Sequence, residues 1–434
     1  MHPSRKGLAV AALGLGLSVL PALGLASLWP AWVFFWALLL LFFGLDLVLA
    51  MRARDIQESL RLPDMLHVGA TGVAHLELSV RSRSTPAEIK LDLSDNLTPQ
   101  PARRGVLSKE GASFEFPLLP TRRGNAAVEA AWVRYEGPFG LIVREVRIPI
   151  DRSVSVVPNV PSVRAAALQF FSDREYRAGL KIERFVGDGT EFDVLRDYAP
   201  GLDRRSIDWK ASARHTRLLS RQFRAERSHQ VVLVVDTGRL MAEPLEGIPR
   251  LDHAVHAALL LAYFSARSGD RVSLFAFDER PRTFIAPKSG FAAFRALLQR
   301  SGALEYSTAE TNYTLGLTQL QSHLTRRSLV IVLTDFVDTV TAELMIENLH
   351  RLSKRHLVIF VALRDPLLSE LCGERPRTLT ALNRAVVADS LLFDREVVLK
   401  RLMRRGVFCI DAPPRRIGVD LVNRYLEIKR RELI

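Results

Sequence analysis

Two aspartates that follow apolar runs are the residues of this sequence best placed to do chemistry. Asp236 ends the run QVVLVVD at 230–236, and Asp335 ends the run SLVIVLTD at 328–335. Thr311 adds a hydroxyl group in a loop ahead of a helical pattern. Two carboxylates and a hydroxyl at one edge of a sheet could bind a divalent cation such as Mg²⁺, with water completing an octahedron. In the alternative interpretation each aspartate caps a helix N-terminus, where a carboxylate accepts backbone N–H bonds and complements the helix dipole.

The elements that must position these residues follow from the hydrophobic pattern between 230 and 434. Strands are expected at 230–236, 271–277, 328–335, 356–363 and 407–411, and helices at about 250–267, 288–301, 314–325, 340–353, 379–404 and from 415. Strands that are apolar on both faces belong to parallel sheets covered by helices, so we predict a doubly wound α/β domain over 230–434. Ligands of such sheets bind beyond the carboxyl ends of the strands, which is where Asp236 and Asp335 fall.

The sequence before residue 230 contains two further parts of different composition. Between 60 and 158, apolar and polar residues alternate over short runs such as Phe114/Phe116/Leu118, with turn-rich pieces between the runs. This period of two predicts an antiparallel β-sandwich. From 159 to 229 the sequence is polar and rich in arginine, and we interpret it as a charged connecting block.

Residues 1–54 contain two apolar runs, at about 7–29 and 31–51, that are long enough to cross a bilayer. Only Pro30 separates them, so we predict a transmembrane helical hairpin. Four basic residues flank the two runs: Arg5, Lys6, Arg52 and Arg54. The positive-inside rule therefore places both ends, and the body of the protein, in the cytoplasm. In the alternative, the first run is a cleaved signal peptide, and the second run still delivers the body to the cytoplasm. Asp46, near the end of the second run, is expected at the membrane interface.

Composition excludes several classes of protein. Lys and Arg total 60 against 47 Asp and Glu, a net charge of +13. The basic run at 204–227 lacks the interleaved aromatics and the module of a nucleic-acid binder, which leaves anionic lipid, solvent or a partner protein as its neighbour. The 2 cysteines exclude a disulfide scaffold and a cysteine-based zinc site. Without a Gly-Lys pair or a Gly-x-Ser-x-Gly motif, we expect no Walker A loop and no nucleophile elbow, and we predict that the protein is not an enzyme.

A long block between 189 and 214 carries a family resemblance. It reads GTEF, then LRDY, then a glycine, then RSIDWKASAR. This block resembles the signature of the "domain of unknown function 58" family, as do PTRRG at 120–124, GPFGL at 137–141 and VVP at 156–158. The family's usual aspartate before Pro-Phe-Gly-Leu is Gly137 here. The resemblance implies a bacterial inner-membrane protein with a von Willebrand factor A-like domain that works with a MoxR-type AAA+ ATPase.

The α/β part is similar to a von Willebrand A-type domain, whose metal site uses an Asp-x-Ser-x-Ser motif, a threonine and a later aspartate. By this resemblance Asp236, Thr311 and Asp335 are the metal-site residues. Gly238 and Leu240 stand where the two serine hydroxyls are expected. The resemblance therefore implies a degenerate site with an incomplete set of ligands.

The block at 189–214 mixes acids, arginines and aromatics, which is typical of interface anchors. We assign partner binding to Glu191, Arg196, Tyr198, Arg205, Asp208, Trp209 and Arg214. The alternative is an ion-pair network that ties the segment to the sheet, with Trp209 buried.

These predictions describe a multi-domain protein: a transmembrane hairpin, a β-sandwich and a von Willebrand A-like α/β domain. By the resemblance, its function is that of a membrane-anchored cytoplasmic adaptor, with other proteins, a MoxR-type ATPase and membrane lipid as partners. Two alternatives stay open. One is a metal-dependent hydrolase that uses the two sheet-edge aspartates, and the other is a purely structural protein of the cell envelope.

Overall fold

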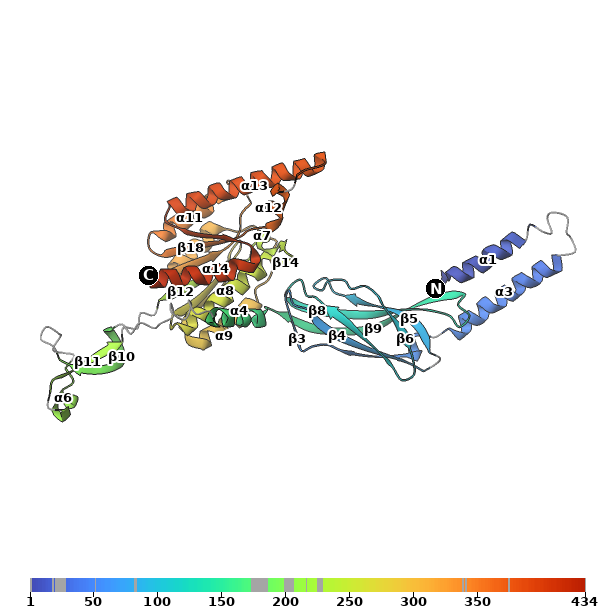
Figure 1. The fold of residues 1–434 in the computed structure, drawn as a ribbon, viewed down its shortest axis with the longest axis horizontal. Helices are drawn as coiled ribbons and strands as arrows, with labels where there is room; N and C mark the ends of the chain where they lie inside the picture. Colours follow the sequence, from blue (N-terminus) through green and yellow to red (C-terminus); the bar gives the residue numbers. More distant parts are fainter. Residues whose placement is uncertain are drawn as a thin grey trace. The chain divides into compact units, whose positions relative to one another are not determined.

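The computed structural model describes residues 2–17, 19, 29–50, 52–81, 84–172, 186–198, 207–215, 217–224, 229–337, 339, 342–373 and 375–433. For 53, 169–172, 186–196 and 221–224 it describes the backbone alone. The chain divides into two compact units, Met1–Asn159 and Val160–Ile434. Figure 1 shows the elements of each unit.

The described residues of the first unit form two α-helices and two sheets. Helix α1 spans Arg5–Leu17 and helix α3 spans Trp29–Leu49. Among the described residues, α3 alone is long and apolar enough to cross a membrane, with a mean hydropathy of 2.3. Residues 18 and 20–28 lie outside the described residues, so the first span of the expected hairpin, at about 7–29, stays a prediction. The two helices do pack together, since the Trp32 indole N–H donates to the Gly14 carbonyl over 3.3 Å.

The sheets of the first unit are almost entirely antiparallel. One has the order β1 (His2–Pro3), β9 (Ile142–Val157), β8 (Gly124–Glu136), β5 (Thr85–Leu93) and β6 (Arg103–Leu107), and β3 (Met65–His67) adds a parallel pairing to β9. The other has the order β2 (Ile56–Arg61), β4 (Gly72–Val80) and β7 (Ala112–Leu118). Alternate residues of these strands, such as Leu76, Leu78 and Phe116, are fully buried. The predicted antiparallel sheet structure is confirmed for this part of the chain.

The second unit is built around a six-stranded, mostly parallel sheet. Its order is β16 (Pro281–Ser289), β15 (Arg271–Phe277), β12 (Gln230–Asp236), β17 (Leu329–Leu333), β18 (Leu357–Leu363) and β19 (Phe408–Ala412). The strands from β15 to β19 along this order pair in parallel, and β16 alone pairs antiparallel, with β15. The edge strand β16 was not predicted. It begins at Pro281 and contains Pro287, and proline is compatible with an edge strand because it has no N–H to donate.

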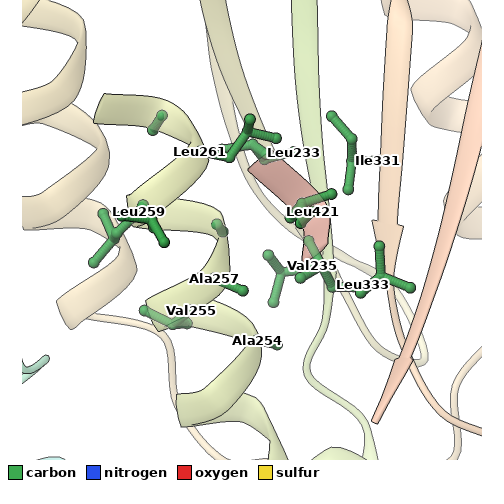
Figure 2. Packing of buried hydrophobic residues seen from close by; sticks show 14 of the residues in the cluster. Leu233, Val235, Ala254, Val255, Ala257, Leu259, Leu261, Ile331, Leu333 and Leu421 are labelled. Atoms are coloured by element: carbon green, nitrogen blue, oxygen red, sulfur yellow. The ribbon is translucent and has the colours of Figure 1, made fainter. Parts of the chain in front are cut away.

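Helices cover both faces of this sheet, and the alternation along each strand assigns the side chains to the two layers. Val231, Leu233 and Val235 belong to a core with α8 (Arg250–Arg267), α9 (Gly290–Gly302) and α14 (Pro414–Arg430). Val232 and Val234 belong to the opposite core with α10 (Tyr313–His323), α11 (Ala342–Ser353) and α13 (Leu379–Arg404). Figure 2 shows Leu233, Val235, Ile331 and Leu333 of this core beside α8, together with Leu421 of α14.

The segment from 159 to 229 contains more regular structure than a connecting block. Its described parts form α4 (Val160–Ser172), α6 (Trp209–His215) and an antiparallel pair, β10 (Val186–Asp197) with β11 (Leu219–Arg224). Ala167 of α4 is buried in the core on the α8 side of the sheet. The segment therefore contributes to the second unit.

Candidate functional site

The carboxyl end of β12 places Asp236 in a pocket of hydrogen-bond donors. The side chain is 1% exposed. Its Oδ1 accepts hydrogen bonds from the Gly238 amide at 2.8 Å and from the Thr311 hydroxyl at 2.8 Å. Its Oδ2 accepts from the Thr334 hydroxyl at 2.5 Å and from the Tyr313 hydroxyl at 3.4 Å. The carboxyl group is thus held by four donors from three different segments.

Burial raises the pKa of Asp236 to about 6, although the hydrogen bonds from Thr334, Gly238, Thr311 and Tyr313 each act to lower it. Desolvation disfavours the charged form, and hydroxyl and amide donors return only part of that cost. When the carboxyl is protonated, its proton can go to a hydroxyl oxygen on the Oδ2 side, because Thr334 and Tyr313 can accept as well as donate.

Gly238 is required by the position of Thr311. A Cβ atom placed on Gly238 would lie 2.1 Å from the Thr311 hydroxyl oxygen and 3.1 Å from Asp236 Oδ1. The hydroxyl of Thr311 therefore occupies the space that a serine at 238 would need. The neighbouring Thr237 does not compensate, because its hydroxyl donates to the Phe277 carbonyl at 3.2 Å.

Asp335 is paired with arginine on both carboxylate oxygens. Arg250, the first residue of α8, donates from Nε to Oδ2 at 3.0 Å, and Arg395 of α13 donates from Nη1 to Oδ1 at 2.8 Å. The Phe336 amide adds a third hydrogen bond, at 3.0 Å. Arg395 also donates from Nε to Asp411 at 2.9 Å, and Arg364 pairs with the same aspartate. The result is a chain of alternating charges along the carboxyl ends of β17 and β19.

These surroundings do not fit a divalent cation. Asp236 faces donors on both oxygens, and the two guanidinium groups of Arg250 and Arg395 already neutralise Asp335. A cation beside Asp335 would be repelled by both arginines. Among the described residues there is no group of three His, Cys, Asp or Glu side chains that could hold a metal ion. Of the predicted trio, Thr311 and Asp236 are hydrogen-bonded to each other, whereas the carboxylate of Asp335 at the same edge is bonded to arginines instead.

The arginines were the part of this site that sequence reasoning missed. Arg250 follows two short strands, β13 (Pro244–Leu245) and β14 (Ile248–Pro249), and Arg395 is in the middle of a 26-residue helix. Neither has a motif around it. The signal available was weak: both are arginines in helices of the α/β unit, and the packing and rotation of these helices against the sheet bring their side chains to Asp335.

The structure places the predicted partner-binding residues on β10, α6 and the turns next to them. Glu191 and Arg196 lie on β10, where the structure gives the backbone alone, and Arg205 lies outside the described residues. Asp208 caps α6 by accepting from the Ala211 amide at 3.0 Å. Trp209, which begins α6, is 67% exposed, so the alternative in which this indole is buried is wrong. Tyr198 is half-buried and Arg214 is exposed.

Comparison with known proteins gives a family match over part of the chain. A model of the family described as "Protein of unknown function DUF58" matches residues 194–387. This confirms the predicted family resemblance over that range. Uncharacterized proteins of Mycobacterium bovis (Mb1516) and Mycobacterium tuberculosis (Rv1480) are each 25% identical over 187 residues. The match covers 43% of this chain and 58% of each relative, so the chain spans only somewhat more than half the length of these relatives.

Two solved structures resemble parts of the chain at low identity. A conserved hypothetical protein, BatB from Bacteroides thetaiotaomicron, is 13% identical with a TM-score of 0.33, and the match covers 47% of this chain and 100% of that one. The CARDB domain of the PF1109 protein from Pyrococcus furiosus is 15% identical with a TM-score of 0.18, over 24% of this chain and 88% of that one. At these TM-scores neither likeness carries an argument about fold or function.

Proposed function

We propose that the protein is a membrane-anchored cytoplasmic adaptor. In this proposal it binds other proteins through a von Willebrand A-like domain and works with a MoxR-type AAA+ ATPase in protein maturation or complex assembly. The observation that carries the proposal is the internal pairing of the sheet edge. Four donors hold the carboxyl group of Asp236 and two arginines pair with that of Asp335, so neither of these two carboxylates is poised to activate a substrate. An edge whose carboxylates are paired within the protein suits recognition better than turnover.

The von Willebrand A-like assignment is supported by the order of the strands. The first strand of the sheet, β12, lies between β15 and β17, and Asp236 ends it. The loop that carries Thr311 and the end of β17 that leads to Asp335 reach the same edge, since both Thr311 and Thr334 donate to Asp236. The residues of this chain do not fit the metal site of such domains, because Arg250 and Arg395 already pair with Asp335.

The rim of this edge offers groups that a partner protein can contact. Arg239 and Glu310 are both exposed and form an ion pair at 2.7 Å, and Val337 is exposed just beyond Asp335. Charged residues around an apolar contact are the usual composition of a protein interface. The class of partner rests on the family resemblance of the block at 189–214, most of which lies inside the matched range.

Membrane anchoring through a hairpin is supported by where the chain enters and leaves the helices. His2 and Pro3, just before α1, pair with β9, and the residues after α3 lead through a short helical turn (Ala53–Asp55) into β2. The start of α1 and the end of α3 are therefore both attached to the same sheet unit. Two spans with both ends on one side satisfy this connection, and the flanking basic residues favour the cytoplasmic side.

Affinity capture from membranes tests the adaptor proposal. The full-length tagged chain should capture an AAA+ ATPase, and the double variant Arg239→Glu, Val337→Asp should capture it several-fold less. Arg351→Glu is the control, because Arg351 is exposed near the end of α11, at the amino ends of the strands. Equal capture by the two variants and the parent would contradict docking at this edge.

A further inference from the structure

Asp46 lies in the last turns of α3, yet its carboxylate binds a loop of the first unit. The side chain is completely buried. It accepts hydrogen bonds from three backbone amides of the β8–β9 loop and the start of β9: Phe139 at 2.8 Å, Leu141 at 2.9 Å and Ile142 at 3.0 Å. Three amides on one carboxylate form a built anion-binding nest, here filled by a side chain of the apolar helix.

The loop is shaped to receive this carboxylate. A Cβ atom on Gly137 would lie 2.2 Å from Asp46 Oδ1, so only glycine leaves room at this position. Gly140 has a φ of +70°, which glycine adopts without strain, and its amide donates to the Gly137 carbonyl at 2.9 Å. The GPFG sequence thus forms a tight turn around the end of the Asp46 side chain.

The other side of the same loop faces the start of α1. The Leu141 carbonyl accepts from the Ser4 amide at 2.8 Å, and the Gly140 carbonyl accepts from the Ser4 hydroxyl at 2.5 Å. A Cβ atom on Gly7 would lie 2.4 Å from the Leu141 carbonyl oxygen, so α1 approaches the loop closely. Asp46 of α3 thus accepts from amides of the loop, and Ser4, just before α1, donates to its carbonyls, so both helices bind the backbone of this loop.

Phe139 extends this contact along α3 towards the middle of the apolar span. Its ring lies 5.2 Å from the ring of Phe42, one turn before Asp46, and the side chain is 46% exposed. Phe42 is seven residues from the end of α3 at Leu49. At 1.5 Å per residue, the aromatic pair lies about 10 Å inside that end. The neighbouring surface of α3 is apolar and exposed, with Leu41, Leu45 and Val48 among the exposed side chains.

We propose that the loop Gly137–Leu141 is a membrane-dipping element that places Phe139 among the lipids beside α3. Backbone amides in a lipid environment need internal partners, and Asp46 supplies acceptors for the three that face it. Lys6 and Glu136, which form an exposed ion pair at 3.2 Å next to the loop, mark the headgroup level. The occupant of the exposed face of Phe139 is the bilayer itself, since that face continues the lipid-facing surface of α3. This inference rests on the anchoring of α3 in the proposed function.

Nitroxide labels in proteoliposomes test this placement with the full-length chain. Cys372 and Cys409 are free and are first replaced, by Cys372→Ser and Cys409→Ala. One label is then attached through Phe139→Cys and the control label through Met65→Cys. Met65 is apolar and 52% exposed, and it pairs with Ser155, thirteen residues along β9 from the loop, about 40 Å away.

Oxygen, which concentrates in the bilayer, should speed the spin relaxation of the nitroxide at 139. A water-soluble nickel complex should have little effect on the relaxation of this nitroxide. The label at 65 should behave in the opposite way. In an Asp46→Leu background, which removes the acceptors of the three amides, the label at 139 should become accessible to nickel. If the label at 139 is as accessible to nickel as the label at 65 in chains that float with the liposomes, the inference is wrong. Chains that do not float with the liposomes at all would instead contradict the proposed anchoring.

Discussion

A carboxyl group that is almost completely buried needs either a proton or a full set of donors, and Asp236 has provision for both. Its Oδ1 faces a backbone amide, which can only donate, and its Oδ2 faces two hydroxyls, which can donate or accept. The site therefore tolerates the neutral acid as well as the anion. Such an arrangement makes the stability of the second unit depend on pH in a way that a paired surface aspartate would not.

The expected pH dependence follows from the raised pKa of Asp236, about 6 in the fold against 3.8 as the ordinary value. Between these values the folded chain holds a proton that the unfolded chain has lost, so the free energy of unfolding falls as pH rises from about 4 to 6. The total change is about 3 kcal/mol. Hydrogen exchange of peptides that cover β12, corrected for the intrinsic pH dependence of exchange, measures it.

The variant Asp236→Asn should remove this slope and be at least as stable as the parent above pH 6. Its amide oxygen can keep the hydrogen bond from Gly238, and its amide N–H groups can donate to the hydroxyls on the Oδ2 side. If the variant and the parent show the same slope between pH 4 and 6, another group is responsible for it.

Because the Thr311 hydroxyl fills the space beside Gly238, we predict that substitutions at 238 and 311 have non-additive effects on the free energy of unfolding. Gly238→Ala should cost about 1–3 kcal/mol of unfolding free energy, because its Cβ would meet the Thr311 hydroxyl oxygen at 2.1 Å. The cost should fall markedly in a Thr311→Ala background, which removes that oxygen. Gly373→Ala is the control, since a Cβ there meets nothing within 4 Å. Additive effects at 238 and 311 would show that the fold moves to relieve the clash.

At the residue scale, the sequence predicted which oxygen-bearing side chains meet but not the charges that surround them. Asp236, Thr311 and Asp335 follow from strand ends and a loop, because parallel strands bring their carboxyl ends to one edge. Arg250 and Arg395 depend on how two helices are rotated against that edge. A rotation of one residue would move each guanidinium by about 100° around its helix, and the sequence pattern does not fix it so closely.

At the scale of elements, Arg395 attaches α13 to the ends of two strands. It donates to Asp335 after β17 and to Asp411 on β19, and its guanidinium lies over the Phe336 ring at 5.3 Å. Little of the first half of α13 is buried: Ala388 is the only buried residue before Val398 among the described residues of the helix. The helix thus depends on its second half, and on this arginine, for its attachment.

Arg395→Met should lower the free energy of local unfolding of α13 and β19 by about 3 kcal/mol. The reason is that two largely buried aspartates would each lose a partner. Lys400→Met in the same helix should change little, since Lys400 and Glu396 form an exposed pair at 2.6 Å. Hydrogen exchange of α13 and β19 peptides in the two variants makes the comparison. Equal protection of these peptides in both variants would mean that the arginine contributes no net attachment.

Elements with strong apolar patterns were predicted, and those with mixed patterns were missed. The runs at 230–236, 271–277 and 356–363 correspond closely to strands β12, β15 and β18. The pair β10–β11 was missed because charged residues interrupt its alternation, so the segment resembled a connecting block. Strand β16 was missed because its apolar residues lie between prolines and on an edge, where burial is partial.

At the scale of the whole molecule, one aspartate links the apolar helix α3 to the sheets of the first unit. Asp46 was expected at the interface from its position near the end of an apolar run. Its three amide partners could not be predicted, because they lie more than 90 residues away in the sequence. The sequence did single out the GPFGL motif at the same place, which begins with Gly137. The structure gives a physical reason for that glycine: the carboxylate of Asp46 fills the space beside it.

Replacement of Gly137 should therefore separate α3 from the β8–β9 loop of the first unit. In Gly137→Ala the new methyl group would collide with Asp46, and the three amides of the loop would lose their acceptor. We expect a loss of about 2–4 kcal/mol in local stability, seen as faster proteolysis between 137 and 142 in membranes. Gly44→Ala is the control, because Gly44 lies on α3 and a Cβ atom there would meet nothing within 4 Å. Unchanged proteolysis in Gly137→Ala would contradict the tight fit.

The last prediction concerns the side of the membrane on which the body of the protein lies. Strand β1 pairs with β9, so the residues before α1 must lie on the same side as the sheets of the first unit. Cys372 is exposed in α12 (Pro366–Gly373) of the second unit. In right-side-out spheroplasts a membrane-impermeant thiol reagent should leave it unlabelled, and permeabilisation should allow labelling. A cysteine introduced as Ser27→Cys, three residues before the Pro30 that separates the two expected spans, should be labelled without permeabilisation in a Cys372→Ser background. Labelling of Cys372 in intact spheroplasts would place the body of the protein outside and overturn the adaptor proposal. If neither position is labelled in intact spheroplasts, the connection between the two apolar runs does not reach the outside. The first run would then not cross the membrane, and α3 would anchor the chain by entering the membrane from the cytoplasmic side without crossing it.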